Sequence, residues 1–284
     1  MTEKTLKKPQ QRVGLLDEIR GFAIICMVVY HAMYDLKYVF GLDVPVFFED
    51  WFDVIRDVFA AMFIFISGTV CRYSRNNLKR GAQCFFIGMV MTFVLPFFTG
   101  GTIYFGILHF LGISMMLFGL GEKFFDVIPA WVGIIAFTAL FVLTWNIPNS
   151  PVIANIPRVI WDSGSFTAIG SSLPAVAEDY SNSFIGIKGL FEWHLPEAAY
   201  QAGALFPLGL HNGRFASSDY FPMLPWFFLF VAGSSFGVWA KSGSLPKFFY
   251  PTHIKWLSAV GKYTIWIYIL HQPVLYLIFS LIFR

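Results

Sequence analysis

The chain has 284 residues, of which 57% are hydrophobic and 13% are charged, and its formal net charge is +3. A soluble domain carries about 25% charged residues, so this composition excludes an ordinary soluble protein and indicates an all-α polytopic membrane protein. The basic residues are scattered among loops, so the small positive charge predicts no nucleic-acid binding. The spacing of the three cysteines fits neither a zinc site nor a disulfide framework, and we interpret them as core residues.

A polar, basic leader at residues 1–14 precedes a single predicted membrane domain at 15–284. Apolar stretches of the length that a bilayer requires predict a bundle of about seven transmembrane helices. The predicted spans cover residues 16–40, 54–73, 81–99, 103–120, 127–146, 221–240 and 256–282. Between the fifth and the sixth lies a long connection, 147–218, in which 199–210 is the best candidate for a re-entrant segment.

The distribution of Lys and Arg predicts the orientation. With the N-terminus in the cytoplasm, fourteen of the 20 Lys and Arg residues fall on the cytoplasmic side, which is the asymmetry expected of a membrane protein. The long connection and the C-terminus are then non-cytoplasmic. The first apolar run contains His31 and Asp35 and lacks a small-residue cleavage site, so it predicts a membrane span and not a signal peptide. We expect a multi-pass protein of a bacterial-type cytoplasmic membrane.

The first span carries ionisable residues within its apolar sequence. A charge in hydrocarbon costs roughly 2.5–3.5 kcal/mol on insertion scales, so intramembrane ionisable groups are candidates for function. At about 100° per residue, Arg20, His31 and Asp35 fall on one stripe of the helix. The stripe therefore faces a protein interior or an aqueous cavity.

Three histidines from three spans are predicted to lie at one depth. With a rise of about 1.5 Å per residue, His31 lies in the outer half of the first span, His109 near the outer start of the fourth, and His271 in the outer half of the last. Two further polar residues lie at the outer start of the sixth span: Asp219 and Tyr220. Histidine titrates near neutrality and serves as a general base or proton carrier. Three imidazoles can bind zinc, but no spacing signature supports such a site, and we predict no metal.

Other interpretations stay open at this point. His109 fits a hydrogen-bonded structural histidine, and Asp35 fits an interfacial pair with Lys37 or Arg56. A proton-coupled transporter also uses intramembrane His and Asp, although the internal repeats typical of transporters are not visible here. A non-catalytic membrane scaffold is the third class.

Five sequence blocks, spread from residue 15 to 276, resemble the heparan-α-glucosaminide N-acetyltransferase catalytic-domain family, within the wider group of transmembrane acyltransferases. The blocks are LDEIRGFAIICMVVYHAMYDL at 16–36, FIFISG at 63–68, GILHFLGISMML at 106–117, DYFPMLPWFFLFVAG at 219–233 and GKYTIWIYILHQPVLY at 261–276. The resemblance covers nearly the whole chain, but the connection at 147–218 resembles nothing that we can place.

The resemblance implies an integral-membrane enzyme that moves an acetyl group from cytoplasmic acetyl-CoA, its co-substrate, to a sugar amine or hydroxyl of a glycan or other acceptor across the membrane. We expect His31 to act as the base, Asp35 to orient it, and His271 to bind the acceptor or the developing oxyanion. Human-type members of this family are expected to carry Asn at the position of His31, so the resemblance supports the site more firmly than the choice of base. We expect direct transfer, with a route through an acetyl-histidine as the alternative to exclude.

We expect three residues to contact the acceptor, namely His109, Asp219 and Tyr220. Basic groups at the inner face suit the phosphates of CoA. The set is Arg20, Arg72, Arg75, Lys79 and Arg80. The remaining expected partner is membrane lipid, and the sequence is also compatible with a homo-oligomer.

Overall fold

A computed structural model describes residues 13–48, 50–99, 102–145, 147–148, 158–162, 165–169, 195–201, 203–211, 215 and 217–283. The regular secondary structure of this part is helical apart from one antiparallel pair of strands, and turns and extended segments connect the elements. The helices are α1 (Gly14–Tyr34), α2 (Asp50–Cys71), α3 (Asn77–Val94), α4 (Pro96–Thr99), α5 (Ile107–Val127), α6 (Ala130–Leu143), α7 (Glu197–Gln201), α8 (Met223–Ser242), α9 (Lys255–Lys262) and α10 (Thr264–Phe283). A π-helical turn, Asp35–Val39, extends α1, and short 3-10 turns lie at Pro45–Phe48, Phe206–Leu208 and Lys247–Phe249.

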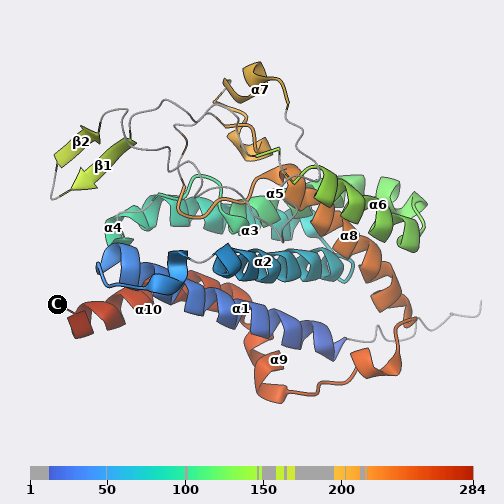
Figure 1. Ribbon diagram of the computed structural model, residues 1–284. Coiled ribbons are helices and arrows are strands. Elements are labelled where there is room, and N and C mark those ends of the chain that lie inside the picture. Colours follow the sequence, from blue (N-terminus) through green and yellow to red (C-terminus); the bar gives the residue numbers. More distant parts are fainter. Residues whose placement is uncertain are drawn as a thin grey trace, which may run out of the picture.

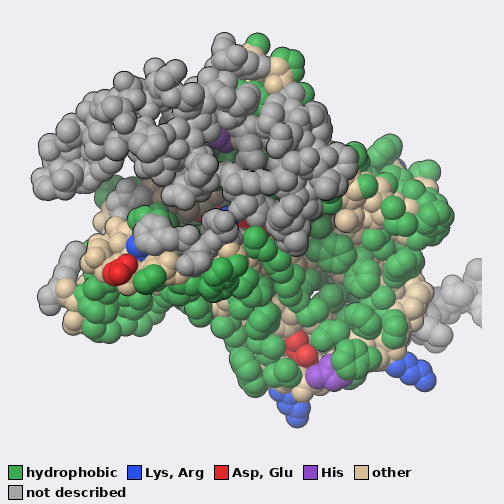
Figure 2. Space-filling model, viewed as in Figure 1, with side chains coloured by type: hydrophobic (Ala, Val, Ile, Leu, Met, Phe, Trp, Pro, Cys, Tyr) green, Lys and Arg blue, Asp and Glu red, His purple; other side chains and the backbone are tan. Residues whose placement is uncertain are grey.

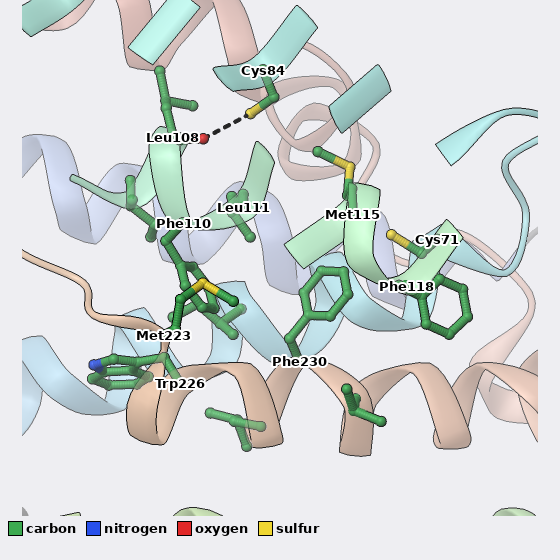
Figure 3. Close-up of a cluster of buried hydrophobic side chains, with 14 of the residues drawn as sticks. Cys71, Cys84, Leu108, Phe110, Leu111, Met115, Phe118, Met223, Trp226 and Phe230 are labelled. Atoms are coloured by element: carbon green, nitrogen blue, oxygen red, sulfur yellow. Dashed lines mark hydrogen bonds between the residues drawn. The ribbon is translucent and has the colours of Figure 1, made fainter. Parts of the chain in front are cut away.

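The long helices form one bundle (Figure 1). Helix α1 packs on α2, α9 and α10, while α3 packs on α5, and α8 packs on both α2 and α6. The largest group of buried side chains lies between α2, α5 and α8. Within it, Phe118 of α5 and Phe230 of α8 meet edge to face with ring centroids 6.4 Å apart (Figure 3). Where Figure 2 draws described residues, the surface in that view is largely apolar, as expected of helices that face lipid.

Five helical segments are long and apolar enough to cross a membrane. They are Gly14–Val39, Val54–Cys71, Ile107–Val127, Met223–Ser242 and Thr264–Phe283. The prediction of a helical membrane protein is therefore confirmed. The other two predicted spans correspond to α3 with α4 and to α6, a shorter apolar helix.

The predicted span at 81–99 is divided at Pro96, the first residue of α4. Proline has no N–H to donate to the preceding turn, and it suits the first position of a new helix. The helix before it also begins earlier than predicted, at Asn77, because the side chain of Asn76 accepts a hydrogen bond from the Lys79 amide at 2.8 Å.

The last predicted span, 256–282, is two helices and not one. Helix α9 ends at Lys262 and α10 begins at Thr264. The carboxylate of Glu18 in α1 accepts hydrogen bonds from the backbone N–H groups of His253 and Ile254, which precede α9. This side chain satisfies amides that a helix start leaves without intrahelical partners, so α9 is fixed to the first turns of α1 instead of continuing the axis of α10.

Glycines allow the closest helix contacts. A Cβ atom on Gly68 of α2 would lie 1.9 Å from the carbonyl oxygen of Phe230, and one on Gly233 of α8 would lie 2.0 Å from that of Phe65. At this crossing the Thr69 hydroxyl donates to the carbonyl of Gly233 at 2.9 Å. Small residues and interhelical hydrogen bonds are the usual means by which membrane helices associate.

The connection at 147–218 is described in parts. Strands β1 (Arg158–Asp162) and β2 (Ser165–Ile169) pair antiparallel, an element that the sequence analysis did not predict. The candidate re-entrant segment, 199–210, contains the end of α7 and the 3-10 turn Phe206–Leu208. Tyr200 is buried there and donates a hydrogen bond to the carbonyl of Ile147 at 2.8 Å. A re-entrant path for this segment stays a prediction.

Candidate active site

The first and the last long helices bring two histidines together. The ring centroids of His31 in α1 and His271 in α10 are 5.0 Å apart, with the ring planes tilted by 56°. His271 is 8% exposed, whereas His31 is half-buried. The His31 ring also contacts the ring of Tyr30 edge to face, with the ring centroids 5.8 Å apart. The two histidines therefore form the centre of a polar cluster within an apolar bundle, as their predicted depths required.

A carboxylate lies one helical turn beyond His31. Asp35 is 1% exposed and begins the π-helical turn that ends α1. The side chain of Gln272, next to His271 in α10, donates a hydrogen bond to it. The atom Asp35 Oδ2 has no hydrogen-bond partner among the described residues. His31 and Asp35, one helical turn apart, thus meet two side chains of α10 at one level of the bundle. These two side chains are His271 and Gln272.

Backbone and side-chain hydrogen bonds fix the position of His271. Its Nδ1 lies 2.6 Å from the carbonyl oxygen of Tyr268, one turn earlier in α10. The Tyr268 hydroxyl donates to Asp219 Oδ2 at 3.1 Å, and the same oxygen accepts from the N–H of Ile107 at 3.0 Å. Asp219 therefore links α10 to the first residue of α5. A carboxylate is favourable at that helix start, where N–H groups lack intrahelical partners.

The environment of Asp219 raises the pKa of its carboxyl group, because burial disfavours the charged form. The hydrogen bonds from Ile107 and Tyr268 act in the opposite direction and stabilise the carboxylate.

Tyr220 follows Asp219 but lies in a different environment. Its hydroxyl donates to the carbonyl of Phe206 at 2.6 Å, and its ring contacts the rings of His211 and Phe215. Burial raises the pKa of Tyr220, so its hydroxyl is a hydrogen-bonding group and not an ionised one. Tyr220 thus belongs to an aromatic cluster, and in the chain it is next to Asp219, which bonds Tyr268 near His271.

His109 lies between α3 and α5. It is 2% exposed, its Nε2 is 3.3 Å from the hydroxyl of Thr92, and its ring contacts Phe85 and Phe105. These contacts favour the structural alternative for His109, since they join two packed helices. Its role toward an acceptor stays a prediction.

Two of the predicted basic residues are engaged with protein groups. Arg20 lies 3.6 Å from the carboxylate of Asp17 and also reaches the carbonyl of Gly261. Arg72 is buried at 6% exposure, pairs with Asp126, and donates from Nε to the carbonyl of Ser234 at 3.2 Å.

The other three basic residues are exposed, namely Arg75, Lys79 and Arg80. They lie between the end of α2 and the first turn of α3, near Arg72, whose carbonyl accepts a hydrogen bond from Lys241 at 2.8 Å. Arg20 occupies the early part of α1, and His31 lies about 16 Å farther along that helix at the usual rise. Basic residues and the histidine pair thus occupy different levels of the bundle.

Tyr268 and Gln272 belong to the site but were not predicted from the sequence. Their positions beside His271 in a predicted span are the only signal that the sequence offers for them. Among the described residues, no group of three or more His, Cys, Asp or Glu side chains is arranged to hold a metal ion.

Apolar helices of membrane-spanning length around a buried cluster of His, Asp and Tyr define a membrane protein with an internal polar site. A family model described as heparan-alpha-glucosaminide N-acetyltransferase, catalytic, matches residues 12–273. The chain belongs to this family, and the resemblance found in the five sequence blocks is confirmed. Family and helices together indicate a membrane acyltransferase. No curated protein and no solved structure was found to match the chain.

Proposed function

We propose that the protein transfers an acetyl group from acetyl-CoA to a sugar amine or hydroxyl on the opposite side of the membrane. The observation that supports this proposal most strongly is the contact between His31 and His271. The contact lies inside the bundle, at a different level from the basic residues. One end of the bundle offers groups for an anionic donor, and the polar cluster offers groups for proton transfer.

The donor, acetyl-CoA, is a co-substrate with several phosphate groups. Arg75, Lys79 and Arg80 are exposed, and guanidinium and ammonium groups are suited to phosphate. We propose these three as the phosphate-binding residues, with Arg72 holding the nearby helix ends. The pantetheine arm then extends along the helices and carries the thioester to the level of His31.

At that level, the acceptor's amine or hydroxyl attacks the thioester carbonyl and the carbon–sulfur bond breaks. A neighbouring imidazole removes the acceptor's proton, a contribution of about 10²–10⁴-fold to rate. Asp35 and Gln272 hold the end of α1 against α10, while Asp219 and Tyr268 hold the other side of the site. We propose Tyr220 and the aromatic rings beside it for contact with the acceptor.

This topology requires a cytoplasmic N-terminus, seven membrane crossings that include α3 and α6, and a non-cytoplasmic connection at 147–218. We propose residues 15–284 as one membrane domain in a bacterial-type inner membrane. Cysteine labelling from each side of sealed vesicles, at Arg75 and at Asp43, tests the orientation: the two positions react from opposite sides if it is correct.

The function is tested with purified protein in lipid nanodiscs and acetyl-CoA labelled in the acetyl group. We expect CoA release that depends on a glucosamine-type acceptor and loss of this release in the double variant His31→Ala/His271→Ala. The matched control is His253→Ala, because His253 is exposed and its ring nitrogen bonds only the nearby carbonyl of Phe248. Acceptor uptake without CoA release identifies a transporter instead.

A further inference from the structure

We infer that His271, and not His31, is the general base, and that Nε2 is the atom that accepts the proton. The inference rests on the proposed acetyl transfer and assigns the roles within its histidine pair. It depends on which ring nitrogen of each histidine is already committed to the protein.

The hydrogen bond to Tyr268 determines the tautomer of His271. A carbonyl oxygen has lone pairs and no proton, so the 2.6 Å contact between His271 Nδ1 and the carbonyl of Tyr268 requires a proton on Nδ1. In a neutral imidazole the other nitrogen, Nε2, then carries a free lone pair. A neutral His271 therefore accepts a proton at Nε2 and has no proton to donate there.

The free nitrogen of His271 is enclosed in the protein and, within the residues that the structure describes, has no partner that would occupy its lone pair. His271 Nε2 is buried and has no hydrogen-bond partner among the described residues. A buried polar atom without a partner is uncommon in folded proteins. The ring of His31 lies beside the His271 ring, with the ring centroids 5.0 Å apart. An acceptor amine or hydroxyl that donates to Nε2 satisfies the orphaned atom.

The surrounding hydrogen bonds also suit a base at this place. When Nε2 takes the proton, the imidazolium keeps its Nδ1–H bond to the Tyr268 carbonyl, whose dipole stabilises the new positive charge. Tyr268 is held in turn by its hydroxyl bond to Asp219. Tyr268 and Asp219 are positioning residues, because they act on the base and not on the substrate.

His31 lacks such a restraint. Within the described part of the chain, its side chain makes ring contacts with Tyr30 and His271 and no hydrogen bond. Its tautomer is therefore free to follow the substrate. In this assignment His31 shapes the acceptor site and forms a hydrogen bond with the bound acceptor, while His271 takes the acceptor's proton.

The acceptor's nitrogen or oxygen forms a bond to the acetyl carbon, and the bond from that carbon to the sulfur of CoA breaks. The proton of the acceptor moves to His271 Nε2 and then to the departing thiolate. The products are the acetylated acceptor and CoA in its thiol form, and His271 returns to its neutral tautomer.

The first test is independent of activity. Protein labelled with ¹⁵N in its histidines and held in nanodiscs is examined by nitrogen–proton correlation NMR, with the His271 signals assigned by their loss in His271→Asn. We expect a protonated Nδ1 and an unprotonated Nε2 at neutral pH. A proton on Nε2 with a bare Nδ1 overturns the inference.

The second test compares matched variants. His271→Asn keeps an N–H donor at the position of Nδ1, and with it the bond to Tyr268, but removes Nε2. His31→Asn makes the same change on the facing ring, and His253→Asn is the control. We expect kcat to fall about 10²–10⁴-fold in His271→Asn. The fall in kcat in His31→Asn should be smaller than this by a factor of at least ten.

The outcomes separate the two levels of the proposal. If the wild type transfers acetyl groups, and this activity survives in His271→Asn but is lost in His31→Asn, the base assignment is overturned. The proposed function then still stands. A wild-type protein that releases no CoA with any acceptor overturns the proposed function, whatever the tautomer of His271.

Discussion

Gly68 and Gly233 face each other where α2 crosses α8, and each would place a Cβ atom within about 2 Å of a backbone carbonyl oxygen of the other helix. Backbone atoms cannot move aside as side chains do, so the two helices must separate to accept a larger residue. Because α8 begins at Met223, shortly after Asp219 in the chain, this crossing also supports the candidate site.

We expect Gly68→Leu and Gly233→Leu to destabilise the protein by about 1–3 kcal/mol, the usual range for overpacking, and to lower its unfolding temperature in detergent. Gly121→Ala is the control, because its Cβ would meet only the ring of Phe125 in the same helix, at 3.1 Å. An unchanged unfolding temperature in both leucine variants would show that α2 and α8 are not this close.

Glu18 caps α9 from another helix. In Glu18→Ala the amides of His253 and Ile254 lose their acceptor, at a cost of about 0.5–2 kcal/mol for loss of a cap. We expect faster hydrogen exchange throughout residues 253–262, while α1 itself is unharmed because alanine favours helices. The exposed Glu122 provides the control, Glu122→Ala. Equal exchange in the two variants would mean that α9 is held by its packing on α1 and not by Glu18.

Some features of this fold follow from signals within one segment of the sequence, and others depend on residues far apart in the chain. Apolar length predicted the membrane helices, and the depth of His31 and His271 predicted that they share a level. The break between α9 and α10 depends on an acceptor supplied by Glu18, far away in the chain. The acceptor for His271 is a backbone carbonyl, which every residue has, so no residue type reveals it in advance.

The position of His109 shows the same limit from another direction. Its depth in the predicted fourth span resembles that of the other two histidines, but depth does not say which helix lies opposite. The ring packs toward Thr92 and Phe85 of α3. Helical periodicity identifies the polar face of a span, whereas the choice of partner helix depends on packing of the whole bundle.

Arg72 and the exposed basic residues are expected to respond differently to substitution. Arg72 bonds a carbonyl of α8, pairs with Asp126 and lies 4.8 Å from the centroid of the Phe118 ring. Lysine lacks the planar fork that serves such a site, so Arg72→Lys should lower stability by about 1–3 kcal/mol, since a buried carbonyl loses its donor. The KM for acetyl-CoA should remain that of the wild type.

Arg75→Ala and Arg80→Ala should instead raise the KM for acetyl-CoA with an unchanged unfolding temperature, because both side chains are exposed. Measuring both quantities on all three variants separates support of the fold from donor binding. A raised KM in a stably folded Arg72→Lys would place Arg72 in contact with the donor.

Asp219 gives a prediction for pH, because burial and hydrogen bonding oppose each other at its carboxyl group. The pKa in the folded protein is raised above the ordinary value of 3.8, so the folded state binds more protons than the unfolded state above that pH. The contribution of Asp219 to stability is then fully present below about pH 4 and is lost as the pH rises through the folded pKa. Asp219→Asn keeps a carbonyl acceptor for Ile107 but cannot ionise.

The unfolding temperature of Asp219→Asn relative to the wild type should therefore increase as the pH is raised from 4, and then level off. The exposed acid Asp43 supplies the control, Asp43→Asn, measured over the same range in the same detergent so that other titrations cancel. A relative stability that instead declines with rising pH would mean that the bonds from Ile107 and Tyr268 outweigh burial. Asp219 would then hold the start of α5 and the base-bearing turn of α10 as a fixed negative charge.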